Sequence, residues 1–161
     1  MNIEIVCIGS LKEPWLKEAE KEYIKRLSSY VKVNITESSE KRLAKNPSPA
    51  DEDIVRKTEG ETLLNFSEKY NNAFIFALDM RGKQFSSEGF AKHLGELALS
   101  GKSTLVFLIG GSLGLPDEVR LKADLVLSFS DMTFPHQMMR IILLEQLYRA
   151  QKILRGEPYH K

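Results

Sequence analysis

The chain is poor in cysteine and tryptophan, each of which occurs once among its 161 residues. A single thiol excludes an internal disulfide, so we expect Cys7 to be a small core residue in a reducing compartment. The first residues lack a basic flank followed by an apolar run, and no apolar run reaches the roughly 18 residues that a membrane span needs. We therefore expect a cytoplasmic protein with no membrane partner.

The spacing of a metal site is also lacking. His93, His136 and His160 have neither one another nor acidic neighbours at ligand intervals, so no metal is expected. The net charge is only +1, but residues 132–161 contain five basic and two acidic side chains. This local excess fits a contact with the phosphates of a nucleic acid, and it also fits the preference of helix C-termini for cations.

The length and a hydrophobic content of 42% fit one globular domain that spans residues 1–161. Short apolar or alternating runs predict strands over residues 2–8, 31–35, 73–78, 104–109 and 125–129. Apolar residues at helical spacing predict helices over residues 14–30, 51–70, 86–100, 117–122 and 135–155. The alternation predicts an α/β fold, with a mostly parallel sheet flanked by helices and ligands at the carboxyl ends of the strands.

Two of the segments between predicted helices and strands have the composition of loops or turns. Residues 38–50 contain two prolines and many polar side chains, which predicts a mobile loop. Residues 79–82, Asp-Met-Arg-Gly, are expected to turn the chain after the strand 73–78.

Residues 110–114 form a glycine-rich segment directly after the predicted strand 104–109. A turn without side chains lets backbone amides and carbonyls approach a flat polar ligand, although a simple chain reversal also favours glycines. The pattern Gly-x-Ser-x-Gly resembles the nucleophile elbow of serine hydrolases, with Ser112 as the nucleophile. An elbow needs a substantial helix after it, and only a short one fits before the next strand. The pattern differs from the dinucleotide fingerprint, which disfavours NAD.

Two segments near the C-terminus carry many chemically active side chains. Residues 128–136 follow the last predicted strand, so they form a second loop at the same edge of the sheet. His136 then begins the last helix, where a histidine can be a cap, a base or a ligand contact. In residues 155–161 the aromatic and cationic side chains suit stacking on a base and binding of phosphates, while a docked C-terminal cap is the alternative.

Together these segments resemble the ribosomal RNA large subunit methyltransferase H family, a member of the knotted SPOUT class. The likeness rests on Phe107–Gly114, Ser128–His136, Arg155–Lys161, Asn2–Val6 and the pattern Leu78-Asp79-x-x-Gly82, and it covers essentially the whole chain. The resemblance implies a homodimer with a C-terminal trefoil knot, which uses S-adenosylmethionine to methylate N3 of a pseudouridine in 23S rRNA, within the ribosome. General rules of chain topology would instead favour an ordinary doubly wound sheet, because true knots are rare.

The resemblance also implies site residues by position. Residues expected to bind S-adenosylmethionine are Leu78, Gly110, Phe129, Ser130, Asp131, Met132, Thr133 and Phe134, with Asp131 acting mainly through its backbone. Residues expected in catalysis are His136, Arg140, Tyr159 and His160, and those expected on RNA are Arg149, Arg155 and Lys161. Either histidine, or water, can remove the imide-like proton of the base. A tail donated by the second subunit would make each active site shared.

Two other functions stay open at this point. A noncatalytic ribosome-binding or RNA-binding protein can use the same fold without the reaction, and a serine hydrolase would use Ser112. Binding of S-adenosylmethionine separates the methyltransferase from both alternatives.

Overall fold

Five parallel strands form the centre of the computed structural model, which describes residues 1–159. In chain order the strands are β1 (Asn2–Ile8), β2 (Lys32–Ser38), β3 (Phe74–Gln84), β4 (Thr104–Ile109) and β5 (Leu125–Ser128). Across the sheet the order is β2-β1-β4-β3-β5, and every pairing is parallel. The predicted α/β fold with a parallel sheet is therefore confirmed.

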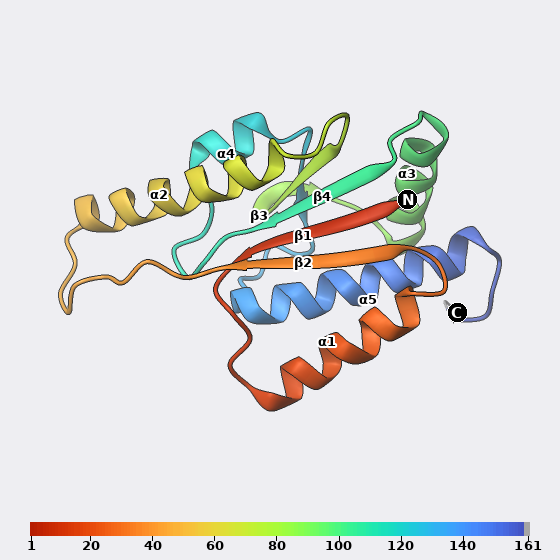
Figure 1. Cartoon of the computed structure of the whole chain (residues 1–161), viewed down its shortest axis with the longest axis horizontal. Coiled ribbons are helices and arrows are strands. Elements are labelled where there is room, and N and C mark those ends of the chain that lie inside the picture. Colours follow the sequence, from red (N-terminus) through yellow and green to blue (C-terminus); the bar gives the residue numbers. More distant parts are fainter. Residues whose placement is uncertain (160–161) are drawn as a thin grey trace.

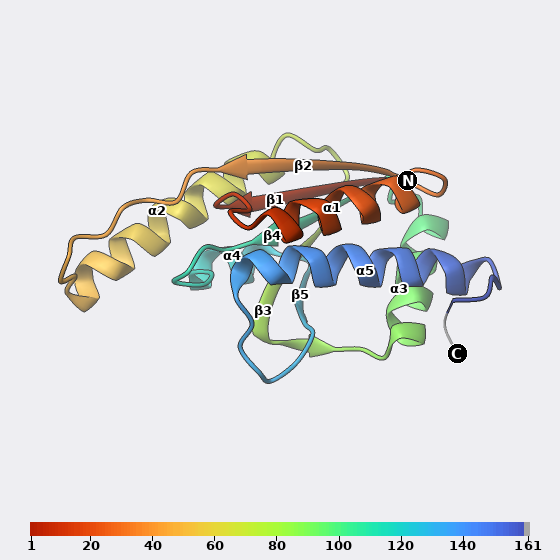
Figure 2. The ribbon, with the colours of Figure 1, turned by 90° about the horizontal axis from the view of Figure 1, so that it is seen from below.

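Helices cover both faces of this sheet, as Figures 1 and 2 show. One face carries α1 (Pro14–Leu27), α3 (Ser87–Leu99) and α5 (His136–Leu154), and the other carries α2 (Pro49–Ser67) and α4 (Asp117–Lys122). Alternate side chains of β1 point to the two faces of the sheet. Ile3 and Ile5 pack toward α5, whereas Val6 and Ile8 pack toward α2 and α4. The continuous apolar composition of the strands is a direct consequence of this two-sided burial.

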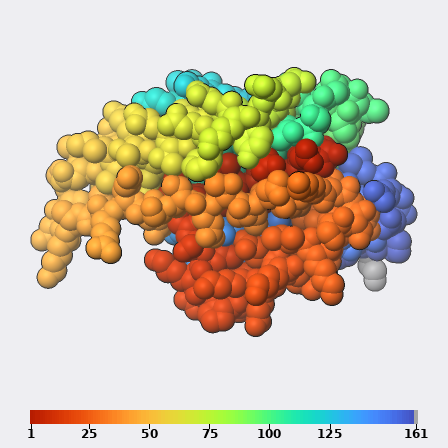
Figure 3. Space-filling view, viewed as in Figure 1, coloured from red at the N-terminus to blue at the C-terminus, as the bar shows by residue number. Residues whose placement is uncertain are grey.

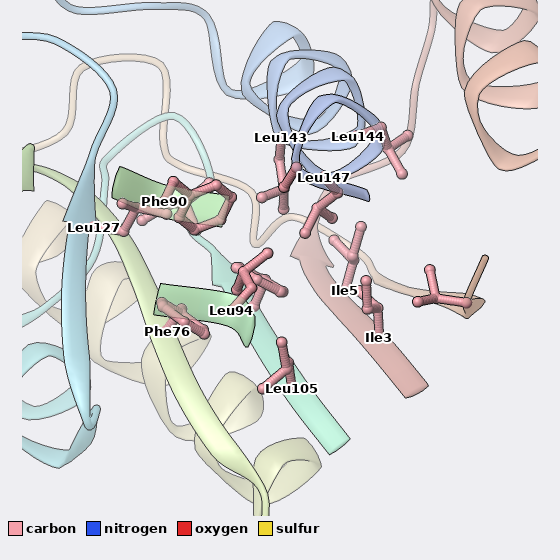
Figure 4. Packing of buried hydrophobic residues seen from close by; sticks show 14 of the residues in the cluster. Ile3, Ile5, Phe76, Phe90, Leu94, Leu105, Leu127, Leu143, Leu144 and Leu147 are labelled. Atoms are coloured by element: carbon pink, nitrogen blue, oxygen red, sulfur yellow. The ribbon is translucent and has the colours of Figure 1, made fainter. Parts of the chain in front are cut away.

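The larger of the two cores lies between the sheet and α5. Leu143, Leu144 and Leu147 of α5 are fully buried there, and Leu143 and Leu147 point toward the strands (Figure 4). The rings of Phe76 and Phe107 stack with centroids 4.6 Å apart across β3 and β4. Truncation of such a leucine to alanine typically costs about 2–5 kcal/mol, so α5 is held firmly against the sheet.

Local signals explain where the helices begin and end. The Ser86 hydroxyl accepts a hydrogen bond from the Gly89 amide at 3.0 Å and so forms the N-cap of α3. Ser48 and Asp51 form a reciprocal capping box at the start of α2, which begins at Pro49. Gly156 has a φ of +64° and ends α5. Within residues 1–159 none of these helices combines the length and apolar character needed to cross a membrane.

The turn predicted over residues 79–82 is wrong, because β3 continues through it to Gln84. Leu127 of β5 pairs with Leu78 and again with Lys83, so the residues between them bulge out of the ladder. A Cβ atom at Gly82 would lie only 2.5 Å from the Val126 carbonyl oxygen. Glycine therefore allows β3 to cross the backbone of β5 in direct contact. The trefoil knot that the family resemblance implies stays a prediction.

Candidate active site

A cavity of about 680 Å³ opens at the carboxyl ends of β3, β4 and β5. Its walls come from the continuation of β3, from the turn 110–115 after β4, and from the loop 129–135 that leads into α5. The position is the edge at which parallel α/β sheets bind their ligands, and the volume is typical of a site for a small molecule. The glycine turn and the second loop thus face one crevice, as the sequence indicated.

Most of the predicted cofactor residues line this cavity. They are Leu78, Gly110, Phe129, Ser130, Met132, Thr133 and Phe134. Asp131 does not line it, because its Oδ1 atom accepts a hydrogen bond of 2.6 Å from Nε2 of Gln84, at the end of β3. The carboxylate of Asp131 therefore fixes the loop to β3. Contact of all eight residues with S-adenosylmethionine stays a prediction.

The glycine turn is closed tightly on itself. Gly114 has a φ of +75°, and its amide donates a hydrogen bond of 3.0 Å to the Gly111 carbonyl. A Cβ atom at Gly110 would lie 2.9 Å from the backbone of Gly114 and 3.0 Å from Leu115. From α2, Nε of Arg56 donates a hydrogen bond of 3.1 Å to the Leu113 carbonyl. The turn therefore presents bare backbone to the cavity in a conformation that its surroundings hold fixed.

Hydrogen bonds between residues close in sequence order the loop after β5, and this loop carries apolar side chains. Ser128 donates its hydroxyl hydrogen to the Ser130 carbonyl at 3.0 Å, and the Met132 amide donates to the Ser130 hydroxyl at 3.0 Å. Met132 is 73% exposed and Met80, from β3, is 50% exposed, although both line the cavity. Flexible thioether side chains adapt easily to a flat ring. They give the cavity an apolar rim that a ligand would cover.

His136 brings a titratable ring to the same cavity at the first residue of α5. Its Nε2 atom is buried and lies 3.0 Å from Oε1 of Glu40, outside the geometry of a hydrogen bond. The two groups are close enough for an ion pair whenever the imidazole is protonated. Oε2 of Glu40 also lies 3.9 Å from the Lys12 ammonium. The loop between β2 and α2 thus supplies a carboxylate to the only histidine of the described part of the chain that lines the cavity.

Arg140 lies one turn further along α5 and is 2% exposed. Its guanidinium binds Glu20 of α1 at 3.0 Å, Glu37 of β2 at 2.5 Å and the Gly9 carbonyl at 3.0 Å. These bonds join α1, β2 and the end of β1 to the start of α5. Arg140 does not line the cavity, and the catalytic role that the resemblance implies for it stays a prediction.

Cys7 lies beside Arg140 in the core. Burial raises the pKa of its thiol to about 12, although the charge of Arg140 acts in the opposite direction. The thiol is therefore protonated and unreactive at neutral pH, in agreement with its predicted role as a small core residue.

The tail is the segment 155–161, and its described residues 155–159 follow the end of α5 that lies opposite His136. The Tyr159 hydroxyl donates a hydrogen bond of 3.2 Å to Glu145, and the Tyr159 ring packs edge-on against Tyr148. The Arg149 guanidinium lies 4.9 Å from the Tyr159 ring centroid and 2.6 Å from Glu145. Burial is the main reason why the pKa of Tyr159 is raised to about 12, so this hydroxyl keeps its proton.

Another predicted RNA-binding residue, Arg155, lies near the same end. Arg155 is exposed, with its guanidinium 4.5 Å from the centroid of the Tyr30 ring. His160 and Lys161 lie outside the described residues. Since α5 has 19 residues, about 28 Å separate its two ends. The structure therefore brings His136 together with the cofactor residues, but it does not bring Tyr159, Arg149 or Arg155 to the cavity of the same chain.

Several side chains that shape the cavity gave no signal in the sequence. They are Glu40, Arg56, Glu59 and Gln84, which act through contacts with residues far away in the chain. Polar residues in a loop, or on the polar side of a helix, carry no periodic pattern that would single them out. A polar loop next to a predicted ligand edge was the one available indication.

The alternative uses of this region find no support in the geometry. Ser112 is exposed, and no hydrogen bond joins it to another side chain within residues 1–159. The helix that follows the turn, α4, has only six residues and starts at Asp117, unlike the helix of a nucleophile elbow. In the same part of the chain, no group of three or more His, Cys, Asp or Glu residues is placed to hold a metal ion.

Comparison with known proteins gives consistent results over the whole chain. Residues 1–160 match the family described as "Predicted SPOUT methyltransferase". Three proteins called "Ribosomal RNA large subunit methyltransferase H" are among the relatives, each aligned over 161 residues and over 100% of both chains. Identity is 53% for Clostridium novyi (strain NT), 52% for Carboxydothermus hydrogenoformans and 48% for Clostridium kluyveri.

A solved structure also shares the fold. It is "The structure of a probable methylase family protein from Haemophilus influenzae Rd KW20", with a TM-score of 0.56 over 99% of this chain and 70% of that chain. The sequence identity is 13%, so this likeness concerns the fold alone.

Proposed function

Because the chain belongs to the ribosomal RNA large subunit methyltransferase H family of SPOUT methyltransferases, we propose that it transfers a methyl group from S-adenosylmethionine to N3 of a pseudouridine in 23S rRNA. Family membership makes it a 23S rRNA methyltransferase. The observation that carries the finer proposal is the cavity at the carboxyl ends of β3, β4 and β5, with a glycine turn on one side and an apolar loop on the other.

The residues of the cavity fit S-adenosylmethionine. Bare backbone at Gly110 and Gly111 can approach polar edges of an adenine or a ribose, in space that a Cβ atom would fill. Leu78, Phe129 and Phe134 supply apolar walls for a flat base. When bound, S-adenosylmethionine supplies a methyl group that is already activated by its positive sulfur.

The protein then has two tasks of its own. It must hold the uracil ring with N3 in line with the methyl group, and it must accept the proton that N3 loses as the new bond to carbon forms. His136 lines the cavity, and an imidazole can accept a proton near neutral pH. We assign His136 as the first candidate for this base, ahead of His160 and water. Glu40, 3.0 Å from His136 Nε2, is placed to stabilise the charged ring that results.

The length of α5 determines how the tail takes part. The tail begins about 28 Å from His136, and Tyr159 packs on Glu145 of its own helix, outside the cavity of its own chain. In a two-fold symmetric dimer with the α5 helices running in opposite directions, each tail would reach the cavity of the other chain. Tyr159 can then lie against the uracil ring, and Arg149 and Arg155 can bind phosphates beside it. We therefore propose a homodimer with two shared active sites.

Calorimetric titration with S-adenosylmethionine, followed by methyl transfer, tests the proposed function. We expect binding to the wild-type protein and transfer of tritiated methyl groups to ribosomes or 23S rRNA that lack the modification. Because N3 lies on the pairing edge of the base, reverse transcription should stop at the modified nucleotide. RNA binding without cofactor binding would instead favour a noncatalytic protein, and acylation of Ser112 by a serine-directed probe would favour a hydrolase.

Two variants separate catalysis from binding. His136→Ala should lower the transfer rate at saturating substrate and leave the affinity for S-adenosylmethionine nearly unchanged, with a flatter pH profile than the wild type. An unchanged rate and pH profile would exclude His136 as the base. His136→Gln, which keeps a polar side chain of similar size, serves as the matched control for loss of the titrating group.

A further inference from the structure

Residues 39–48 form an extended connection between β2 and α2, which we call the basic arm. It carries three exposed cationic side chains, Lys41, Arg42 and Lys45. Its single acidic residue is Glu40. In Figure 1 the arm runs as a thin orange trace beyond the carboxyl edge of the sheet, and in Figure 3 its atoms project from the body of the molecule. The arm therefore extends from the edge of the sheet that holds the cavity.

The root of the arm is fixed to the glycine turn through Glu59 of α2. The amide of Lys41 donates a hydrogen bond of 2.9 Å to Oε1 of Glu59, a residue that is only 5% exposed. The other carboxylate oxygen of Glu59 lies 2.9 Å from the place where a Cβ atom of Gly111 would be. One buried side chain thus contacts both the arm and the turn that lines the cavity.

A second contact joins the arm to the cavity itself. Oε1 of Glu40 lies 3.0 Å from Nε2 of His136. The Glu40 side chain also occupies the space that a Cβ atom at Gly9 would need. The acidic group of the arm therefore points toward the body of the protein. The cations of the arm follow within five residues of Glu40. Five fully extended residues span at most about 17 Å. A few successive nucleotides of one nucleic-acid strand cover the same distance.

The cationic groups themselves have no protein partner that would account for them. Within residues 1–159 none of Lys41, Arg42 and Lys45 takes part in an ion pair. At the far end of the arm, Ser48 and Asp51 cap α2, so both ends of the segment are anchored. Exposed, unpaired cations that are held beside a site create a local positive potential, which attracts a polyanion.

We propose that the basic arm binds phosphates of the RNA strand next to the nucleotide that enters the cavity. This proposal rests on the proposed function, since it takes rRNA as the substrate. Contacts with phosphates set the position of a nucleic acid and carry no sequence information. The arm would therefore govern how tightly the substrate RNA binds and where it lies, whereas the cavity and the tail act on the base.

The test is the double variant Arg42→Ala/Lys45→Ala, assayed on unmodified ribosomes or 23S rRNA. We expect KM for the RNA substrate to rise about tenfold near physiological salt, because phosphate contacts dominate such affinities. The logarithmic dependence of RNA affinity on salt should become shallower by about one unit for each cation removed. The rate at saturating RNA and the affinity for S-adenosylmethionine should stay within about twofold of the wild type.

A matched control removes two cations elsewhere. Lys32→Ala/Lys92→Ala changes exposed lysines at the start of β2 and on α3, away from the carboxyl edge of the sheet. It should leave KM and the salt dependence unchanged. Equal KM values for the arm variant and this control would overturn the proposal, and so would an unchanged salt dependence.

Filter binding of 23S rRNA keeps the two proposals apart. Wild-type protein that transfers no methyl group would overturn the proposed function but not the role of the arm. Equal RNA affinity of the wild type and the arm variant would overturn the role of the arm, whether or not methyl transfer is found. Thermal unfolding of both variants should match the wild type, since all four side chains are exposed.

Discussion

The two ends of α5 differ in what they offer to the reaction. At the N-terminal end His136 lines a cavity made from β3, the glycine turn and the loop after β5, and Arg140 secures the helix behind it. At the C-terminal end Tyr159 lies on the surface of its own helix, with Arg149 over its ring. About 20 Å of helix separates His136 from Arg149. Under the proposed function, one chain would carry both halves of an active site without assembling them.

Deletion of Tyr159–Lys161 removes the aromatic residue at the C-terminal end of α5. If the tail completes the cavity of a second chain, methyl transfer should fall about a hundredfold, because the uracil ring is no longer held in line with the methyl group. Affinity for S-adenosylmethionine, measured by calorimetry, should change little. Tyr159→Phe keeps the ring and loses only the hydroxyl, so it should retain far more activity than the deletion. Full activity of the deletion would exclude a role for the tail.

The buried Arg140 holds the N-terminal end of α5 against its neighbours. Arg140→Met would leave Glu20, Glu37 and the Gly9 carbonyl without their common partner. The free energy of unfolding in urea should fall by about 2 kcal/mol, because hydrogen bonds to charged groups are lost while the two carboxylates left behind are partly exposed. Arg26→Met removes an exposed pair with Glu22 and should change stability little. Similar losses in both variants would contradict a structural role for Arg140.

A substitution in the glycine turn is expected to weaken the binding of S-adenosylmethionine. In Gly110→Ala the new methyl group would meet the backbone of Gly114 at 2.9 Å, so the turn must open. The dissociation constant for S-adenosylmethionine should rise at least about tenfold, since the ligand depends on close approach of the backbone. Gly101→Ala is the control, because a Cβ atom there meets nothing within 4 Å although φ is +82°. Equal affinities in the two variants would show that the turn is not part of the cofactor site.

The smallest effect is expected at Glu59. Burial raises the pKa of this carboxyl above the ordinary value of 4.5, so the folded state binds its proton more tightly than the unfolded state. The stability that Glu59 contributes is therefore greatest below pH 4.5 and decreases as pH rises through the raised pKa. Urea unfolding of the wild type and Glu59→Gln should show the variant gaining relative stability over that interval. Glu61→Gln, exposed on the same helix, should show no such trend.

The fold could be predicted from the sequence wherever the signal was local. Apolar strands and amphipathic helices each depend on neighbouring residues, and the structure confirms the ones predicted. The continuation of β3 through residues 79–84 could not be predicted in this way. It depends on contact between Gly82 and Val126, which are distant in the chain and meet only after folding.

The candidate site shows the same division. The glycine turn and the loop after β5 each follow a strand, so their meeting at one edge of the sheet follows from the topology. Which side chains reach the cavity came from the family resemblance. Glu40 and Glu59 were missed because each acts across a tertiary contact, with His136 and with the glycine turn respectively. Asp131 could be placed on the right loop, but its bond to Gln84 could not be foreseen.

We propose that each active site combines the cavity of one chain with the tail of another. Gly110→Ala and the deletion of Tyr159–Lys161 damage one half each, so they should be mixed after unfolding and refolding together, and methyl transfer to unmodified ribosomes measured. In a random mixture half of the dimers pair the two variants, and each such dimer has one intact site, which predicts roughly a quarter of wild-type activity. A mixture no more active than the average of the two separate variants would contradict a shared active site.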